Sequence, residues 1–281
     1  MNPIIMAPTV LPSANATDYL EAAVSAGYEA VGLRLHRSLV MPFHPVVGDE
    51  AQIARIRALL REGAIRVFEV TSFYLAPEMD FAEYEAAMAL GAELGAGIVL
   101  VIASDRERSR LVEHFGRLCE IARGLGQICA VENAPNGGLP TVSSIVELIE
   151  EVGVDNGAIC LDPVNHITAG GTFEELRALP AKLLPYTQFA DADLHPGAVE
   201  VVDGRQKHIP RLLPGEGNMD LAGLLDALPD HIPLSLELPP SARPEEEGSL
   251  SPAQWAARAK AAAETFVTDY HRAARSRERK S

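Results

Sequence analysis

Oxygen-bearing side chains stand near the ends of four apolar segments between residues 128 and 238 of the chain. They are Glu132 in ICAVEN, Asp162 in AICLD, Gln188 in YTQFAD and Glu237 in PLSLEL. An ionised carboxylate in an apolar site is costly unless it is paired, and carboxylates brought together raise one another's pKa values. A divalent cation removes both problems, and oxygen ligands of this kind suit Mn²⁺ or Mg²⁺. If the four segments meet in space, these residues form one metal site.

The segments that must position these side chains alternate with helical patterns. We expect eight strands, at residues 3–7, 30–35, 66–73, 97–103, 128–133, 158–162, 186–191 and 233–238. Most strand starts lie about 30 residues apart, which is the size of a strand–helix unit. The strands are nearly continuous apolar runs, as expected where both faces are covered.

Eight such units predict an α/β protein, a single-domain (β/α)₈ TIM barrel over residues 1–281. An open doubly wound sheet is the alternative, but PTVLPSANAT stands where that fold would carry a glycine-rich nucleotide motif. In a barrel the carboxyl ends of neighbouring strands converge on the active site. The predicted barrel therefore brings Glu132, Asp162, Gln188 and Glu237 into one pocket.

Further polar side chains near strand ends are candidates for substrate binding. We include Arg34, His36, Glu69, His166, Asp191 and Arg211. Simpler roles stay open for several of them. His166 and Asp191 could support neighbouring groups, and Glu69 could be a core carboxylate with its own partners.

The loop after the seventh strand carries a basic cluster in an acidic protein. Arg205, Lys207, His208 and Arg211 precede PGEG (214–217) and the next helix. Barrels often bind an anionic substrate group at this place, and arginine suits bidentate carboxylate or phosphate recognition. We expect Arg211 to hold such a group and the loop to close over the pocket, although a solvated loop with a turn would also explain the pattern.

Composition and charge exclude several classes of function. The 281 residues carry a net charge of −15, which argues against binding to nucleic acid. No apolar stretch is long enough for a transmembrane helix, and the N-terminus lacks the features of a signal peptide. Three cysteines in apolar or helical settings indicate packed, reduced thiols and a cytoplasmic protein. The long final helix could pack on the barrel or on a second subunit, so a homo-oligomer stays open.

The motifs around these residues resemble the xylose isomerase-like TIM-barrel superfamily, the sugar phosphate isomerase/epimerase group. The resemblance covers essentially the whole chain and rests on AVENAP, ICLDPVNH, TQFADAD, RLLPGEGNMDL and LSLELPP. It implies one Mn²⁺, Mg²⁺ or Co²⁺ ion held by Glu132, Asp162, Gln188 and Glu237. Many relatives have histidine where Asn165 and Gln188 stand, and often arginine where Thr168 stands.

The resemblance and the predicted site together imply an enzyme. We expect a divalent-metal-dependent isomerase or epimerase that acts on a small sugar, sugar phosphate or sugar acid through an enediolate, with Glu132 and Glu237 as base and acid. We expect the substrate to be an anionic polyhydroxy molecule. The alternative is a dehydratase of a keto-polyol or dehydroshikimate-like acid. A non-catalytic sugar-acid-binding protein is a further alternative.

Overall fold

The computed structural model describes residues 1–37, 42, 44, 46–63, 65–238 and 250–278. Within these residues, eight parallel strands form a closed barrel in the order β1-β10-β7-β6-β5-β4-β3-β2. They are β1 (Ile4–Met6), β2 (Ala30–Arg34), β3 (Arg66–Leu75), β4 (Ile98–Ala103), β5 (Ile128–Glu132), β6 (Gly157–Leu161), β7 (Tyr186–Phe189) and β10 (Leu234–Leu236). All eight predicted strands and the predicted (β/α)₈ barrel are confirmed.

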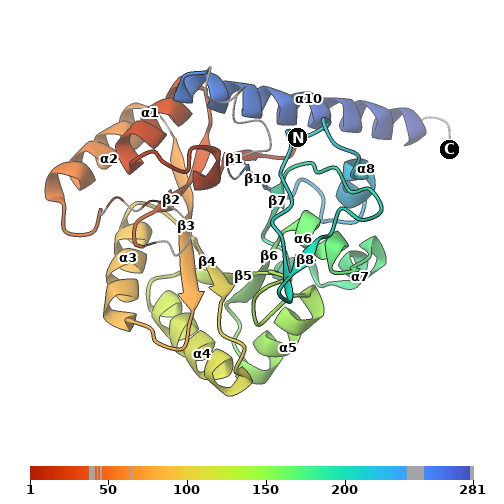
Figure 1. Cartoon of the computed structure of the whole chain (residues 1–281). Coiled ribbons are helices and arrows are strands. Elements are labelled where there is room, and N and C mark those ends of the chain that lie inside the picture. Colours follow the sequence, from red (N-terminus) through yellow and green to blue (C-terminus); the bar gives the residue numbers. More distant parts are fainter. Residues whose placement is uncertain (38–41, 43, 45, 64, 239–249, 279–281) are drawn as a thin grey trace.

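Helices surround the barrel, as Figure 1 shows. They are α1 (Ala16–Ser25), α2 (Glu50–Glu62), α3 (Phe81–Glu93), α4 (Arg108–Gly124), α5 (Val142–Val152), α6 (Pro163–Thr168), α7 (Phe173–Ala178), α8 (Leu221–Leu225) and α10 (Pro252–Glu278), with 3-10 turns η1 (Pro8–Val10) and η2 (Ala181–Leu183). α10 packs on α1 and β1, and its far end extends past the barrel in Figure 1.

Buried apolar side chains fill both sides of the barrel wall. A large cluster lies between strands and helices and includes Phe73, Phe115 and Phe189. A smaller cluster holds Ile98, Leu100, Ala130, Ala158, Cys160 and Tyr186, from the strands β4 to β7. The continuous apolar runs in the sequence reflect this burial on two faces. All three cysteines are buried and free of disulfides, as expected.

Local capping sets where the helices begin. The sequence predicts Thr17 as the N-cap of the first helix, and this prediction is wrong. Asn15, rather than Thr17, caps α1, because its side chain accepts from the backbone N–H of Asp18 at 2.9 Å. The Thr17 hydroxyl instead donates to the Asn15 side chain at 2.6 Å. At α5 the sequence pattern holds fully, with Thr141 in a capping box and Gly153 in the left-handed region at φ 71°.

Two short elements near the strand ends have no clear signal in the sequence. α6 begins directly after β6, with Asp162 as its N-cap and Pro163 in its first turn. The long loop after β7 contains an antiparallel hairpin of β8 (Val201–Val202) and β9 (Arg205–Gln206). Among the described residues, no helix is long and apolar enough to cross a membrane.

Candidate active site

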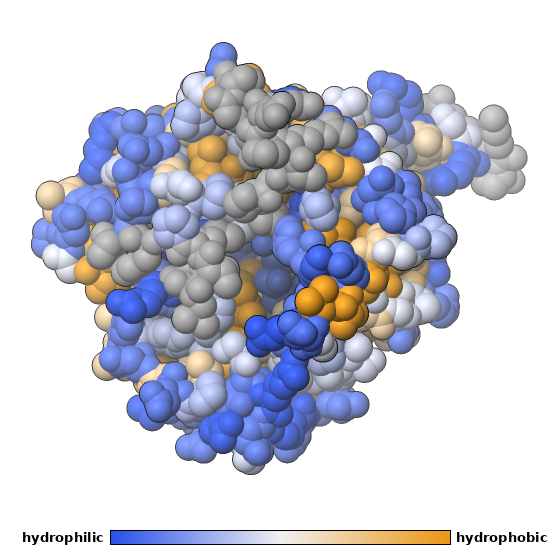
Figure 2. Space-filling model, in the orientation of Figure 1, coloured by the Kyte–Doolittle hydropathy of each residue, from blue (hydrophilic) through white to orange (hydrophobic). Residues whose placement is uncertain are grey.

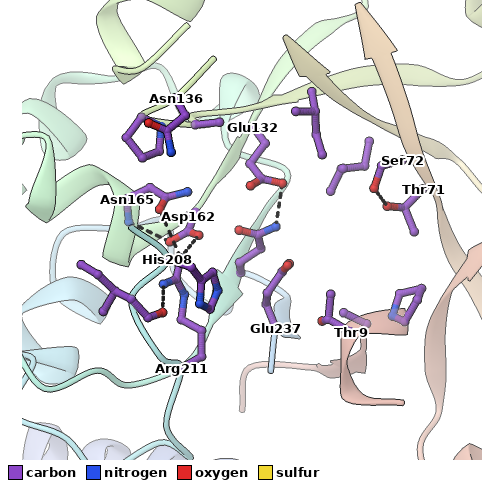
Figure 3. A pocket seen from close by; sticks show the side chains of 18 of the residues that line it. Thr9, Thr71, Ser72, Glu132, Asn136, Asp162, Asn165, His208, Arg211 and Glu237 are labelled. Atoms are coloured by element: carbon purple, nitrogen blue, oxygen red, sulfur yellow. Dashed lines mark hydrogen bonds and ion pairs between the residues drawn. The ribbon is translucent and has the colours of Figure 1, made fainter. Parts of the chain in front are cut away.

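A cavity of about 410 Å³ lies at the carboxyl ends of the barrel strands. All four predicted metal ligands line it, together with three of the predicted substrate contacts: Glu132, Asp162, Gln188, Glu237, Arg34, Glu69 and Arg211. Figure 3 shows Glu132, Asp162 and Glu237 facing a common space, with Thr71 and Ser72 across from them. The barrel therefore brings together groups that are up to 203 positions apart in the chain, from Arg34 to Glu237.

Strand order fixes how the four predicted ligands are arranged. β5, β6, β7 and β10 are consecutive neighbours in the barrel. Glu132 ends β5, Asp162 follows β6, Gln188 lies in β7 and Glu237 follows β10. The two glutamates thus occupy the two ends of this arc, and Asp162 and Gln188 stand between them.

Gln188 is buried, and only one of its two side-chain polar atoms has a hydrogen-bond partner among the described residues. Its Nε2 donates to Glu132 Oε2 at 3.1 Å, whereas its Oε1 has no hydrogen-bond partner among the described residues. The side chain is only 2% exposed. A buried amide oxygen without a donor is costly unless something else binds it. Such an oxygen, next to carboxylates, is a suitable ligand for a hard cation.

Asp162 and Arg211 form a buried ion pair within the cavity. Arg211 Nη2 donates to Asp162 Oδ2 at 2.6 Å and to Asn165 Oδ1 at 3.1 Å, and Nη1 donates to the Ile209 carbonyl at 2.7 Å. The other Asp162 oxygen, Oδ1, accepts the backbone N–H of Asn165 at 2.9 Å and so caps α6. Asp162 therefore has a partner at each oxygen.

Asn133 holds the strand ends that carry Glu132 and Asp162 in register. Its Nδ2 donates to the Asp162 carbonyl at 3.0 Å, and its Oδ1 accepts the Asp162 N–H at 2.8 Å. Asn165 Nδ2 returns a hydrogen bond to the Asn133 carbonyl at 3.0 Å. Sequence reasoning placed Asn133 at a strand end but did not select it as a site residue. Its position directly after Glu132 was the available signal.

Burial dominates the electrostatics of the carboxylates. It raises the pKa of Glu132 to about 8, and the neighbouring charge of Asp162 adds to the rise. Burial and then repulsion from Glu132 raise the pKa of Glu237 well above its usual range. Burial also raises the pKa of Glu69 to about 7, and nearby hydroxyls of Tyr186 and Ser235 offset part of that rise. The cavity therefore opposes the charge of all three glutamates in the absence of a cation.

Glu69 is a buried residue of the cavity wall. It is 2% exposed, its Oε1 accepts only a long 3.4 Å hydrogen bond from Ser235, and its Oε2 has no partner among the described residues. Tyr186 lies close enough to influence its pKa, yet the Tyr186 hydroxyl meets no full hydrogen-bond geometry. Gly32 on β2 makes room, since a Cβ there would lie 3.0 Å from Glu69 Oε1.

Three predicted substrate contacts do not line the cavity. His36 is 2% exposed and packs on Phe73 and Tyr84, with ring centroids 4.3 and 4.9 Å away, and burial lowers its pKa to about 4. His166 lies on α6, with Nε2 3.0 Å from the Thr172 carbonyl ahead of α7. The third is Asp191, whose carboxylate binds backbone N–H groups of the loop after β7.

Asp191 organises the PGEG segment. Its carboxylate accepts the backbone N–H groups of Ala192, Gly215 and Met219 at 2.9, 3.0 and 3.1 Å. Gly217 must approach closely, because a Cβ there would lie 2.4 Å from both Asp191 Oδ1 and the Ala192 carbonyl. This agrees with the simpler reading of Asp191 as a support for its neighbours.

Residues of the rim were not predicted as site residues. Asn136, Gln206, Lys207 and His208 line the cavity, as do Thr9, Thr71 and Ser72. Gln206 and Asn136 exchange two hydrogen bonds, N–H to Oδ1 at 2.9 Å and Nδ2 to carbonyl at 2.8 Å. The loops after β5 and β7 are therefore joined across the cavity edge. Figure 2 shows the surface hollowed near the centre of this face.

The donor set suits a divalent cation, although the side chains are not gathered around one point. Within the part of the chain that is described, no three His, Cys, Asp or Glu side chains lie close enough to hold a metal ion together. The unpartnered Gln188 oxygen and the raised pKa values of Glu132 and Glu237 are the features that a cation would relieve. Arg211, rather than a cation, is the partner of one Asp162 carboxylate oxygen.

Comparison with known proteins identifies close structural relatives of the fold. A family model described as xylose isomerase-like TIM barrel matches residues 20–259. The zinc-containing IolI protein shares 19% identity at a TM-score of 0.76, with 96% of this chain and 99% of that chain covered. No curated protein matches by sequence.

Two further solved structures have the same fold and are named for different reactions. A D-psicose 3-epimerase, solved in the presence of D-fructose, shares 17% identity at a TM-score of 0.68, covering 94% of this chain and 98% of that one. The probable 3-DHS dehydratase AsbF from Bacillus anthracis shares 16% identity at 0.67, covering 92% and 98%. At these identities the likeness shows the fold alone.

Proposed function

Since this chain belongs to the xylose isomerase-like TIM barrel family, we propose that it is a divalent-metal-dependent isomerase or epimerase of a small polyhydroxy substrate. The observation that carries the proposal is the pair of partly buried glutamates, Glu132 and Glu237, at the two ends of the four-strand arc that lines the cavity. The D-psicose 3-epimerase among the structural neighbours supports the same class of reaction.

The cation would be held by four side chains, those of Glu132, Asp162, Gln188 and Glu237. When bound, a divalent cation supplies Lewis-acid stabilisation of negative charge on a substrate carbonyl oxygen and favours the ionised form of nearby carboxylates. The identity of the metal stays open between Mn²⁺, Mg²⁺ and Co²⁺, and the zinc in the IolI neighbour adds a fourth candidate.

The two glutamates would move the proton. A substrate lying across the arc presents one face toward Glu132 and the other toward Glu237. One carboxylate removes the proton from the carbon next to the carbonyl, and the other, as the acid, returns a proton to the enediolate. If the proton returns to the opposite face of the same carbon, the configuration of that carbon is inverted. If it returns to the neighbouring carbon, a ketose and an aldose are interconverted.

The residues around the glutamates would orient the substrate. Thr9, Thr71 and Ser72 lie across the cavity from Glu132 and Asp162. Arg34 and Glu69 also line the cavity. Such polar side chains suit the hydroxyl groups of a sugar chain. Asn133 and Asn165 position the strand ends through their hydrogen bonds to the backbone.

The test is solvent proton exchange, because it does not depend on knowing the product. The protein, loaded separately with Mn²⁺, Mg²⁺, Co²⁺ or Zn²⁺, is incubated in ²H₂O with a panel of ketoses, sugar phosphates and sugar acids. Deuterium incorporation next to the carbonyl, found by mass spectrometry and lost in Glu132→Gln, supports the proposal. Absence of exchange from the whole panel with every metal counts against it.

A dehydratase is the second candidate. The same proton removal could be followed by loss of a β-hydroxyl, and the AsbF neighbour is named as a probable dehydratase. The basic rim of the cavity, where Lys207 lies, suits an acid as substrate. Product analysis separates the two reactions, since dehydration lowers the product mass by one water and creates a conjugated chromophore.

A further inference from the structure

The cavity changes in charge from floor to rim. The buried lining residues include Glu69 and Asp162, which are 2% and 3% exposed. The exposed lining residues are Asn136, Lys207 and His208, on the loops after β5 and β7. Of these three residues, Lys207 is the one that carries an ammonium group. The floor is thus acidic and this edge is basic.

Lys207 is held in place by the backbone around it. Its N–H donates to the Glu200 carbonyl at 2.7 Å, which extends the β8–β9 hairpin. The preceding residue, Gln206, is fixed to Asn136 through two hydrogen bonds and to the Thr168 hydroxyl at 3.2 Å. The lysine is therefore presented at the cavity edge by a hairpin tied to two other segments.

The Lys207 ammonium can exchange its present partner, Glu200, for another anion. Its ammonium contacts Glu200 at 2.8 Å, but the two side chains are 55% and 59% exposed. Exposed ion pairs contribute little free energy, so an anion at the rim can replace Glu200 at small cost. Arg211 differs, because it is 6% exposed and engaged by Asp162, Asn165 and Ile209.

The charged side chains of the cavity limit how many anionic groups a bound substrate can carry. Four carboxylates and three cationic side chains line it, namely Glu69, Glu132, Asp162 and Glu237 with Arg34, Lys207 and Arg211. At the floor, Arg211 is already bound to Asp162, so a second anionic group that reached the floor would lie beside Asp162 and the glutamates. At the rim, the exposed Lys207 can hold one anionic group.

We propose that Lys207 selects substrates with a single anionic end, holding that carboxylate or phosphate at the rim while the uncharged hydroxyl and carbonyl groups reach the floor. This inference rests on the proposed function for the presence of the divalent cation. It moves the anion subsite away from Arg211, which the sequence favoured, to the hairpin of β8 and β9.

The experiment compares ligands that share one carbon skeleton. Binding of glucitol, gluconate, glucitol 6-phosphate and glucarate to the Mn²⁺-loaded protein is measured by calorimetry. Gluconate or the phosphate should bind several-fold more tightly than neutral glucitol, and glucarate no more tightly than gluconate. Whichever of the two single anions binds better identifies the chemistry of the anionic end.

Variants connect the preference to the lysine. Lys207→Gln should weaken binding of the preferred anion roughly fivefold, about the effect of one exposed ion pair, and leave glucitol unchanged. Lys182→Gln is the matched control, because it removes the same charge from an exposed site on η2 outside the cavity. Rising ionic strength should reduce the anion preference of the wild type and have little effect in Lys207→Gln.

Three results would overturn the inference: equal affinity for glucitol and both single anions, no detectable binding of either anion, or an anion preference that survives in Lys207→Gln. These outcomes are separate from the proposed function. Lysine-dependent anion binding without proton exchange contradicts the enzyme proposal alone, and exchange on neutral ketoses without anion preference contradicts the Lys207 proposal alone.

Discussion

Arg211 Nη2 lies 2.6 Å from Asp162 Oδ2, and the two side chains are 6% and 4% exposed. This contact joins the loop after β7 to the end of β6 inside the cavity. A buried charge that loses its partner is strongly destabilised, so each residue depends on the other. Because Asp162 is also a predicted metal ligand, the arginine and a cation compete for the same carboxylate.

Arg211→Gln should therefore destabilise the metal-free protein and favour metal binding. Loss of the guanidinium leaves Asp162 buried beside Glu132 without a cation, at a cost of about 3–5 kcal/mol in the free energy of unfolding. Mn²⁺ should recover part of that loss, and the Mn²⁺ dissociation constant should fall. Urea unfolding with and without Mn²⁺, together with calorimetric titration, measures both effects.

The control for this prediction is Arg110→Gln. Arg110 pairs with Asp105 at 2.6 Å, but its side chain is 43% exposed and lies outside the cavity. It should lower stability by a smaller amount that Mn²⁺ does not recover. Weaker Mn²⁺ binding in Arg211→Gln than in the wild type would show that Arg211 supports the metal site rather than competing with it.

Glu132→Gln and Glu237→Gln should each abolish turnover. Each change keeps the side-chain shape and removes the carboxylate that would accept or return the proton, so we expect kcat to fall by at least about 10²-fold to 10⁴-fold. Metal content is measured in the same samples to separate proton transfer from metal loss. Glu147→Gln, an exposed residue on α5, is the matched control and should behave as the wild type. Near-wild-type rates in either cavity variant would rule out the acid–base assignment.

The stability of the metal-free protein should fall as pH rises. Burial, with a contribution from Asp162, raises the pKa of Glu132 from its usual value of 4.5 to about 8. A carboxyl with a raised pKa binds its proton more tightly in the folded state. Its stabilising effect is therefore present below the unfolded value and is lost as pH rises through the folded value. Thermal unfolding at pH values from about 5 to about 8.5 should show this decline.

The same experiment with Mn²⁺ provides the comparison. A cation binds the ionised carboxylates, so the stabilisation by Mn²⁺ should be larger at high pH than at low pH. In Glu132→Gln the pH-dependent decline of the metal-free protein should be smaller, because one of the titrating groups is gone. A metal-free wild type that gains stability across this range would contradict the account of the cavity electrostatics.

The sequence was sufficient to predict the barrel and several side chains that line its cavity, because both depend on repeating local patterns. Apolar runs marked all eight barrel strands, and side chains such as Glu132 and Asp162 stood where parallel strands end. The convergence of strand ends then follows from the closure of the sheet. The wrong cap at Thr17 shows a limit of this reasoning, since Asn15 offers the same chemistry two residues earlier.

Contacts between loops could not be predicted in the same way. The pairing of Arg211 with Asp162 joins residues 49 positions apart, and the Asn136–Gln206 contact joins residues 70 apart. Neither pair belongs to a periodic element, so no local pattern indicates it. The exposed β8–β9 hairpin, with Val201 60% exposed, likewise lacks the buried face that makes a strand recognisable. The rim of the cavity depends on these contacts.

Glu69 should act as a neutral group, and two variants test this. Burial raises its pKa to about 7, and its Oε2 has no partner within the described residues, so ionisation is opposed. Glu69→Gln keeps a neutral, polar side chain of the same shape and should retain kcat and KM within about threefold, well below the tenfold that 1.36 kcal/mol would give. Glu69→Ala opens space beside Gly32 and should raise KM by about tenfold or more, because a polar group that contacts substrate is lost.

The pH dependence distinguishes this role from a purely structural one. Because the pKa of Glu69 is raised, the wild type should lose stability from this residue as pH rises through about 7, whereas Glu69→Gln should not. At pH about 8.5 the metal-free Glu69→Gln protein should be the more stable of the two, and at pH about 5 the two should be equal. Thermal unfolding of both proteins measures this. If Glu69→Gln is inactive yet folded, the carboxylate of Glu69 is itself required, and the assignment of a neutral role is wrong.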